Sequence, residues 1–174
     1  MGPGFADVVA GVLARTRMDP AALVLELTEG VFIEDGSRAT AVLADLKALG
    51  VRLTLDDFRT GYCSLGYLRR FPVDAIKIDQ EFVADIGHDP SGAAIVAAVS
   101  DLAHALGLDV TAEGVETREQ HDVVTGVGCE LAQGFLYGRP IAAAGVAGLL
   151  SSAGGRPPDA RRSRDDRGRW RATR

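Results

Sequence analysis

The amino-acid sequence predicts an α/β fold with a parallel sheet. Short β-prone runs alternate with stretches of helical periodicity along the 174 residues, which is the order of right-handed βαβ units. The chain contains no Gly-rich phosphate fingerprint of the kind that a doubly wound sheet carries after its first strand. Polar side chains stand instead at the carboxyl ends of successive strands, as in barrel enzymes. We therefore expect an incomplete (β/α)8 TIM-type barrel of about five βα units.

The first half of the chain predicts an N-terminal helix and then a strand, a helix and a second strand. The helix is expected over residues 5–17, and the β-prone run LVLEL predicts a strand over residues 23–27. Apolar residues recur at helical spacing over residues 37–49, and Gly50 follows where a left-handed helix cap belongs. A second strand is expected over residues 51–55.

The second half repeats this alternation, and two of its helices carry recognisable N-terminal signals. Asp89 followed by Pro90 opens a long apolar helix that runs to Gly107. Thr117 and Gln120 have the spacing of a capping box, ahead of a helix that stops near Gly126. Shorter elements complete the pattern: a short helix around residues 64–70, strands over 75–78, 108–112 and 130–133, and a closing helix over 142–150.

The composition narrows the class of protein. Apolar residues make up 47% of the chain and the net charge is −5, as in a soluble globular domain. The two cysteines, Cys63 and Cys129, are far apart and have no companions at zinc-ligand spacing, so neither a disulfide framework nor a structural zinc site is indicated. No signal peptide and no membrane-spanning segment is recognisable, and a cytoplasmic location is expected.

Charge divides the chain into two predicted regions. Residues 152–174 hold eight arginines against three aspartates and few apolar side chains. Such a segment cannot bury enough surface to offset its ordering entropy, so it is expected to be a disordered Arg-rich tail. Residues 1–151, which are strongly acidic, are expected to form the barrel domain.

The polar residues at the strand ends form a candidate site. They are Glu26, the adjacent pair Asp56 and Asp57, Lys77 with Asp79, Glu113, and Gln133. Each one alone is explained by a solvated loop entry, but their shared position at successive strand ends indicates one common rim. Alternate side chains share a face of a strand, so Lys77 and Asp79 are expected to point together.

Several carboxylates gathered at one rim would repel one another unless a cation lies among them. Oxygen ligands without His or Cys favour Mg²⁺ or Mn²⁺. The neighbours Asp56 and Asp57 diverge on a regular strand, so we expect the strand to end there if both bind, and one carboxylate can then bridge two ions about 3.5–4 Å apart. Lys77 can orient or deprotonate an attacking water. The residues alone thus indicate a divalent-ion phosphodiesterase.

Five segments of the chain resemble the EAL family of cyclic di-GMP phosphodiesterases, in the family's order and spacing over about residues 5–150. They are LELTE (25–29), DDFRTGYCSL (56–65), IKIDQEF (76–82), AEGVET (112–117) and QGFLYGRP (133–140). The resemblance implies a magnesium- or manganese-dependent hydrolase, with two ions in the complete site, that opens cyclic di-GMP to linear pGpG.

The resemblance also implies roles for single residues. Lys77 would position or activate water and Glu113 would be catalytic and metal-associated, while Gln133 and Asp79 would lie near the substrate. Glu29 would hold the loop over residues 58–65, which in the family couples dimerisation to metal binding and so implies a homodimer. The implied metal ligands are Glu26, Asp56, Asp57 and Glu113.

Departures from the family pattern leave three hypotheses open. The Glu-Ala-Leu segment and a later asparagine ligand precede the LELTE strand in family members, and neither stands before Glu26 here; Arg59 replaces a glycine and Cys63 a common serine. The chain is an active phosphodiesterase completed by further polypeptide, or a catalytically inactive, degenerate EAL domain that binds nucleotide or a partner protein. The third hypothesis is a fragment of a longer protein with an upstream sensory or cyclase domain.

Overall fold

The computed structural model describes residues 4–28, 36–58 and 71–152. The chain divides into two compact units, Met1–Tyr137 and Gly138–Arg174. All five strands lie in the first unit, and helix α8 (Ala143–Ser152) lies in the second. The predicted domain boundary at residues 151–152 falls next to the undescribed residues 153–174 and stays a prediction, as does the Arg-rich tail.

The first unit is built on one sheet of five parallel strands. Their order in the sheet follows their order in the chain, and every neighbouring pair is parallel. A doubly wound sheet reverses direction at a switch point, whereas a barrel adds strands in sequence. The predicted α/β barrel-type class is therefore confirmed. The strands are β1 (Val24–Thr28), β2 (Arg52–Phe58), β3 (Ala75–Ile78), β4 (Asp109–Ala112) and β5 (Leu131–Ala132).

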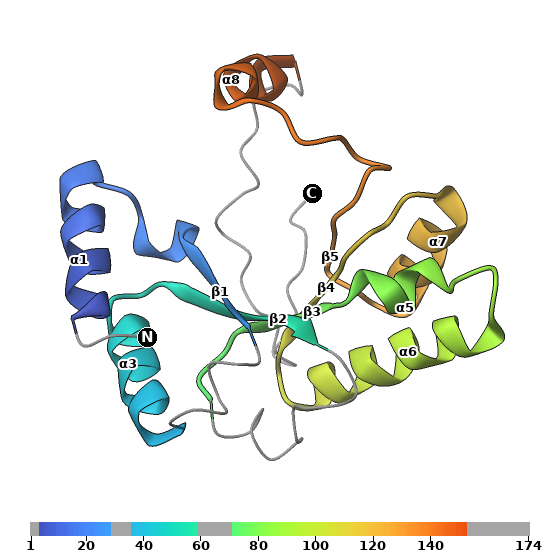
Figure 1. Ribbon diagram of the computed structural model, residues 1–174, viewed down its shortest axis with the longest axis horizontal. Helices are drawn as coiled ribbons and strands as arrows, with labels where there is room; N and C mark the ends of the chain where they lie inside the picture. The colour runs from blue at the N-terminus through green and yellow to red at the C-terminus, as the bar shows by residue number, and fades with distance from the viewer. Residues whose placement is uncertain (1–3, 29–35, 59–70, 153–174) are drawn as a thin grey trace. The chain divides into compact units, whose positions relative to one another are not determined.

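Within the described part of the chain, the two outer strands each have one neighbour, since β1 pairs with β2 and β5 pairs with β4. Figure 1 shows α1 (blue) and α3 (cyan) side by side near β1 and β2, and α6 (yellow-green) packs on β3 and β4. The described helices of this unit, with one 3₁₀ turn, are α1 (Phe5–Thr16), η1 (Pro20–Ala22), α3 (Gly36–Ala48), α5 (Gln80–Ala84), α6 (Pro90–Ala105) and α7 (Arg118–Gly126). No helix among the described residues is long and apolar enough to cross a membrane.

The core lies between the sheet and its helices. Strand side chains such as Leu53, Ile76 and Val110 have no exposed surface, and the helices contribute Leu43 and Val96 in the same state. Each such side chain stabilises the fold by roughly 2 kcal/mol through burial of apolar surface. Because strand side chains alternate, the residues between these apolar positions face the opposite side of the sheet, and this second face carries the polar residues described below.

Several predicted elements are confirmed because their signals are local. β3 occupies the predicted residues. Asp89 accepts a hydrogen bond from the Ser91 amide at 2.8 Å, as the N-cap of α6. Thr117 and Gln120 form the predicted capping box at the start of α7.

Other expectations need correction. The strand predicted over 51–55 continues to Phe58, and the five-residue helix α5 was not predicted. Asp79 caps α5 and lies beyond β3, which ends at Ile78, so it is not the strand partner of Lys77 that alternation predicted. The short helix around residues 64–70 lies outside the described residues.

Candidate metal centre

A bulge in β2 brings the two adjacent aspartates to one rim. Asp56 pairs regularly with Thr28 of β1, but the register with β3 shifts between Leu55 and Phe58. Asp57 has a φ of 53°, in the left-handed region that Asp adopts more readily than most residues. The expectation that the strand ends at the Asp56–Asp57 pair is therefore wrong: β2 continues to Phe58, because a bulge re-aims a side chain without ending the strand.

Lys77 lies at the centre of the site. Its side chain is only 8% exposed. The ammonium has three donors, and it lies within ion-pair distance of three carboxylates: Glu26 and Asp56 at 2.9 Å each, and Glu113 at 2.7 Å. The structure therefore brings together residues of β1, β2, β3 and the position directly after β4, as the sequence predicts.

These contacts stabilise the protonated, charged form of Lys77. Burial by itself lowers the pKa of Lys77, but the bonds to Asp56, Glu113 and Glu26 outweigh it, and its pKa lies above the usual lysine value. Lys77 is therefore a cation at neutral pH in this arrangement. Of the two roles predicted for it, orienting a group by donating hydrogen bonds fits this state better than accepting a proton.

A second cluster overlaps the first. Asp56, Asp57 and Glu113 each offer a carboxylate oxygen within 4.8 Å of the others. Oxygen Oδ1 of Asp56 is buried, and the Lys77 ammonium lies 2.9 Å from it. This oxygen-only set fits a divalent cation such as Mg²⁺ or Mn²⁺.

A cavity of about 690 Å³ opens over this cluster. Its wall includes the predicted residues Asp57, Asp79, Glu113 and Gln133. Asp79 is 4% exposed and accepts a hydrogen bond from the Glu81 amide at 2.8 Å, so it also holds α5 in place. Such a volume suits a ligand the size of a small molecule or nucleotide.

Two loops that follow β4 and β5 are joined directly behind Gln133. The Gln133 amide donates to Ala112 O at 2.8 Å, the Val115 amide donates to Gln133 O at 3.0 Å, and the Leu136 amide donates to Val115 O at 3.0 Å. A Cβ on Gly134 would lie 2.1 Å from Val115 O, so only glycine allows this approach. The paired loops fix Gln133 at the cavity wall.

Some predicted features lie outside the described residues, and some cavity residues were not predicted. Glu29 and residues 59–65 of the loop after Asp57 are among the undescribed residues, so the loop contact and the homodimer stay predictions. The unpredicted cavity residues lie at a strand end or within four positions after one, which is the signal that could have found them. They are Thr28, Gln80, Gly114, Glu116, Gly134 and Phe135.

Comparison with known proteins gives a consistent result. The model of the EAL domain family matches residues 1–140. A curated relative, the bifunctional diguanylate cyclase/cyclic di-GMP phosphodiesterase MucR of Pseudomonas aeruginosa, is 44% identical over 140 residues, which are 80% of this chain and 20% of that protein. The chain thus spans about a fifth of the length of this curated relative.

Two solved structures extend the comparison. The EAL domain of Mycobacterium smegmatis DcpA is 40% identical with a TM-score of 0.83, and the match covers 91% of this chain and 70% of that one. Klebsiella pneumoniae BlrP1, in a complex with manganese and cyclic di-GMP, is 38% identical with a TM-score of 0.73, over 80% of this chain and 36% of that one.

Proposed function

Because this chain belongs to the EAL domain family, we propose that it is part of a cyclic di-GMP phosphodiesterase, which hydrolyses the cyclic dinucleotide to linear pGpG with two divalent ions. The observation that carries the proposal is the convergence of three carboxylates on the Lys77 ammonium, with Asp57 beside them. A further support is that a similar solved structure is a complex of manganese with the same nucleotide.

Four residues would hold the ions. Three of them, Asp56, Asp57 and Glu113, form the tight carboxylate cluster. The fourth, Glu26, shares the Lys77 ammonium with Asp56 and Glu113. Bound Mg²⁺ or Mn²⁺ would supply Lewis-acid stabilisation of the phosphoryl oxygens and acidify water. Asp57 is exposed to solvent at the cavity, whereas Asp56 and Glu113 are partly buried. Asp57 is therefore the ligand that an incoming phosphodiester meets first.

Lys77 prepares the site in the absence of substrate. Three carboxylates that would otherwise repel one another are each bonded to its ammonium, so the side chains are already gathered. Preorganised groups cost less reorganisation free energy when a reaction begins. We expect Lys77 to hold these carboxylates in place.

The charge of the cavity bears on the substrate. Asp57, Asp79, Glu113 and Glu116 line it, and no Lys or Arg does so among the described residues. An anionic dinucleotide would be repelled from this wall unless cations neutralise it. The proposal therefore requires that nucleotide binding depend on divalent ions. Gln133 offers an uncharged amide donor and acceptor at the same wall.

The test is hydrolysis of cyclic di-GMP in the presence of Mn²⁺ or Mg²⁺, with linear pGpG separated by chromatography. The 174-residue chain and a chain extended at its N-terminus are compared, each with Asp57→Asn and with Asp122→Asn, a change of an exposed residue on α7. We expect product from the extended chain, its loss with Asp57→Asn, and no change with Asp122→Asn. Absence of product from both wild-type chains would contradict the proposal.

A second candidate is a degenerate EAL domain that binds nucleotide or a partner protein without turnover. The observation that favours it is that Lys77 already bonds three of the four carboxylates, so the site is partly neutralised without ions. Calorimetry distinguishes the two candidates. Binding of cyclic di-GMP with no linear product from the extended chain supports this candidate over the first.

A further inference from the structure

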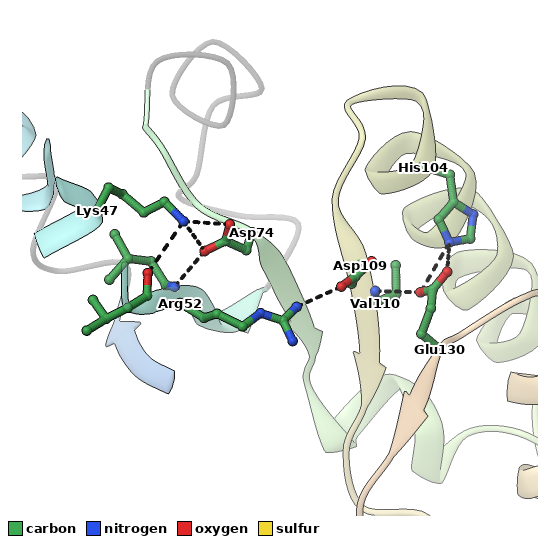
Figure 2. Close-up of polar contacts among 9 residues, drawn as sticks. Lys47, Arg52, Asp74, His104, Asp109, Val110 and Glu130 are labelled. Atoms are coloured by element: carbon green, nitrogen blue, oxygen red, sulfur yellow. Dashed lines mark hydrogen bonds and ion pairs between the residues drawn. The ribbon is translucent and has the colours of Figure 1, made fainter. Parts of the chain in front are cut away.

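An ion pair joins the starts of β2 and β4 across the strand between them. The guanidinium nitrogen Nη2 of Arg52 lies 2.8 Å from Oδ2 of Asp109, and the two residues are 57 positions apart in the sequence. Figure 2 shows the Arg52 side chain extending toward Asp109 from the neighbouring part of the sheet. We call this contact the Arg52–Asp109 brace.

The brace and the candidate metal ligands belong to the same two strands. Arg52 precedes Asp56 by four positions on β2, and Asp109 precedes Glu113 by four positions along β4 and its continuation. Residues an even number apart on a strand share a face. The brace therefore lies on the same face as the carboxylates, about 13 Å further down the strands.

The residue of β3 that lies beside Asp109 is small. The register places Ala75 opposite both Thr54 of β2 and Asp109 of β4. The side chain of Ala75 ends at Cβ, which leaves space for Arg52 to reach over β3. A larger side chain at this position would stand between the two partners.

The candidate metal centre needs such a contact for an electrostatic reason. Asp56 and Asp57 on β2 and Glu113 after β4 repel one another at short range, and this repulsion acts to separate the two strands. Lys77 opposes it at the rim, and the brace opposes it at the other end. We propose that Arg52 and Asp109 are positioning residues that set the spacing of β2 and β4 and thereby the geometry in which Asp56 and Glu113 bind a divalent ion; this rests on the proposed function.

A neighbouring ion pair at the same end of the sheet provides a matched control. Lys47 of α3 lies 2.7 Å from Asp74, which precedes β3, and both are drawn in Figure 2. The side chains of Lys47 and Asp74 are 32% and 25% exposed, against 36% and 15% for Arg52 and Asp109. Asp74 also accepts a hydrogen bond from the Leu53 amide of β2 at 2.8 Å, and Lys47→Met leaves that bond in place. The change therefore removes an ion pair of similar exposure that includes no side chain of β2 or β4.

The experiment compares Arg52→Met and Lys47→Met in the 174-residue chain, with two measurements. The first is Mn²⁺ affinity by electron paramagnetic resonance. The second, without metal, is amide hydrogen exchange of Glu113, whose N–H donates to Ile78 O at 3.1 Å at the rim. We expect Arg52→Met to weaken Mn²⁺ binding about tenfold, which lies within the range for substitutions that act on a site without touching its ligand. We also expect Glu113 exchange to be about tenfold faster with Arg52→Met than with Lys47→Met.

Two further variants keep the result interpretable. Asp109→Asn removes the charge with almost no change of shape and should reproduce Arg52→Met, whereas Arg52→Lys keeps the charge and should restore most of the affinity. Equal exchange rates for Glu113 with Arg52→Met and Lys47→Met would overturn the proposal. If the wild-type chain binds no Mn²⁺, the proposed function fails in this chain, and the exchange measurement still decides whether the brace acts on the rim.

Discussion

The ammonium of Lys77 lies 2.7 Å from the carboxylate of Glu113, which comes from the position directly after a different strand. Two further carboxylates share the same ammonium. One cation thus links three strand ends of the sheet, and this predicts what its removal does.

Lys77→Met should destabilise the protein by about 2 kcal/mol, because it leaves partly buried carboxylates without their cation. Adding Mn²⁺, or lowering the pH until the carboxylates protonate, should recover most of the loss. Urea unfolding with and without Mn²⁺ measures this. Lys47→Met is the control. If Mn²⁺ raises the free energy of unfolding of Lys77→Met no more than it raises that of Lys47→Met, the expectation is contradicted.

The raised pKa of Lys77 fixes the sign of its pH dependence. A group whose pKa is raised in the folded state contributes stability that is complete below the ordinary lysine pKa and is lost as pH rises through the higher folded value. Lys77 therefore stays charged in both the folded and the unfolded chain between pH 7 and 9. Over this range we expect its titration to leave the difference in free energy of unfolding between wild type and Lys77→Met unchanged.

Asp57 has a left-handed backbone as well as a carboxylate, and two substitutions separate these properties. Asparagine accepts this conformation, so Asp57→Asn should keep the free energy of unfolding and weaken Mn²⁺ binding about tenfold or more. Valine resists it, so Asp57→Val should also lose about 1–2 kcal/mol of stability. Urea unfolding and Mn²⁺ titration of both variants check this. Equal stability of the two would show that the backbone at position 57 relaxes freely.

Gly134→Ala should destabilise the protein by about 1–3 kcal/mol, since its Cβ would overlap the backbone of Val115 and force the paired loops apart. The change should also weaken nucleotide binding, because Gln133 is held by the same loops. Gly126→Ala is the matched control, as no atom lies within 4 Å of the position its Cβ would take. Thermal unfolding of both variants measures the difference.

The stability of the protein should also depend on pH through the thiol of Cys129. Burial chiefly, with the nearby charge of Glu130, raises the pKa of this thiol to about 11. The unfolded chain loses this proton at lower pH than the folded one, so the free energy of unfolding should fall as pH rises from about 9 to about 11. The effect should be roughly 1–2 kcal/mol, since the thiol is partly exposed.

The Cys129 expectation is measured in a Cys63→Ser background, so that only one thiol titrates. Cys129→Ala in the same background should remove the fall in stability over this pH range. Alkylation of Cys129 at pH 8 should also be slow compared with free cysteine, because little thiolate is present. Rapid alkylation of the folded protein would contradict the raised pKa.

Much of this fold could be predicted because its signals are local. The apolar run of β3 and the capping residues before α6 and α7 act on neighbouring positions, so a single sequence reveals them. The residue types at the strand ends likewise predicted which side chains meet. The missed helix α5 has a local signal too, since Asp79 stands two positions before the amide it caps, but five residues are too few to show helical periodicity.

The geometry of the site could not be predicted in this way. On a regular strand the side chains of Asp56 and Asp57 would face opposite sides of the sheet. The positive φ of Asp57 and the shifted register bring both to one rim, and neither feature can be seen in the sequence. The contact of Arg52 with Asp109 joins residues 57 positions apart on two strands that are not neighbours in the sheet. Such contacts arise when the sheet is assembled, and no short segment contains them.

Among the described residues β1 pairs with β2 alone, and this has a consequence for the number of oxygen ligands. Any polypeptide that adds itself alongside β1 in the parallel direction finishes at the same rim, next to Glu26. A side chain at that finishing point could complete an ion's coordination shell while every described residue stays in place. Different donors beside β1 would therefore complete the proposed site in different ways, and the choice of donor would affect which ion it prefers.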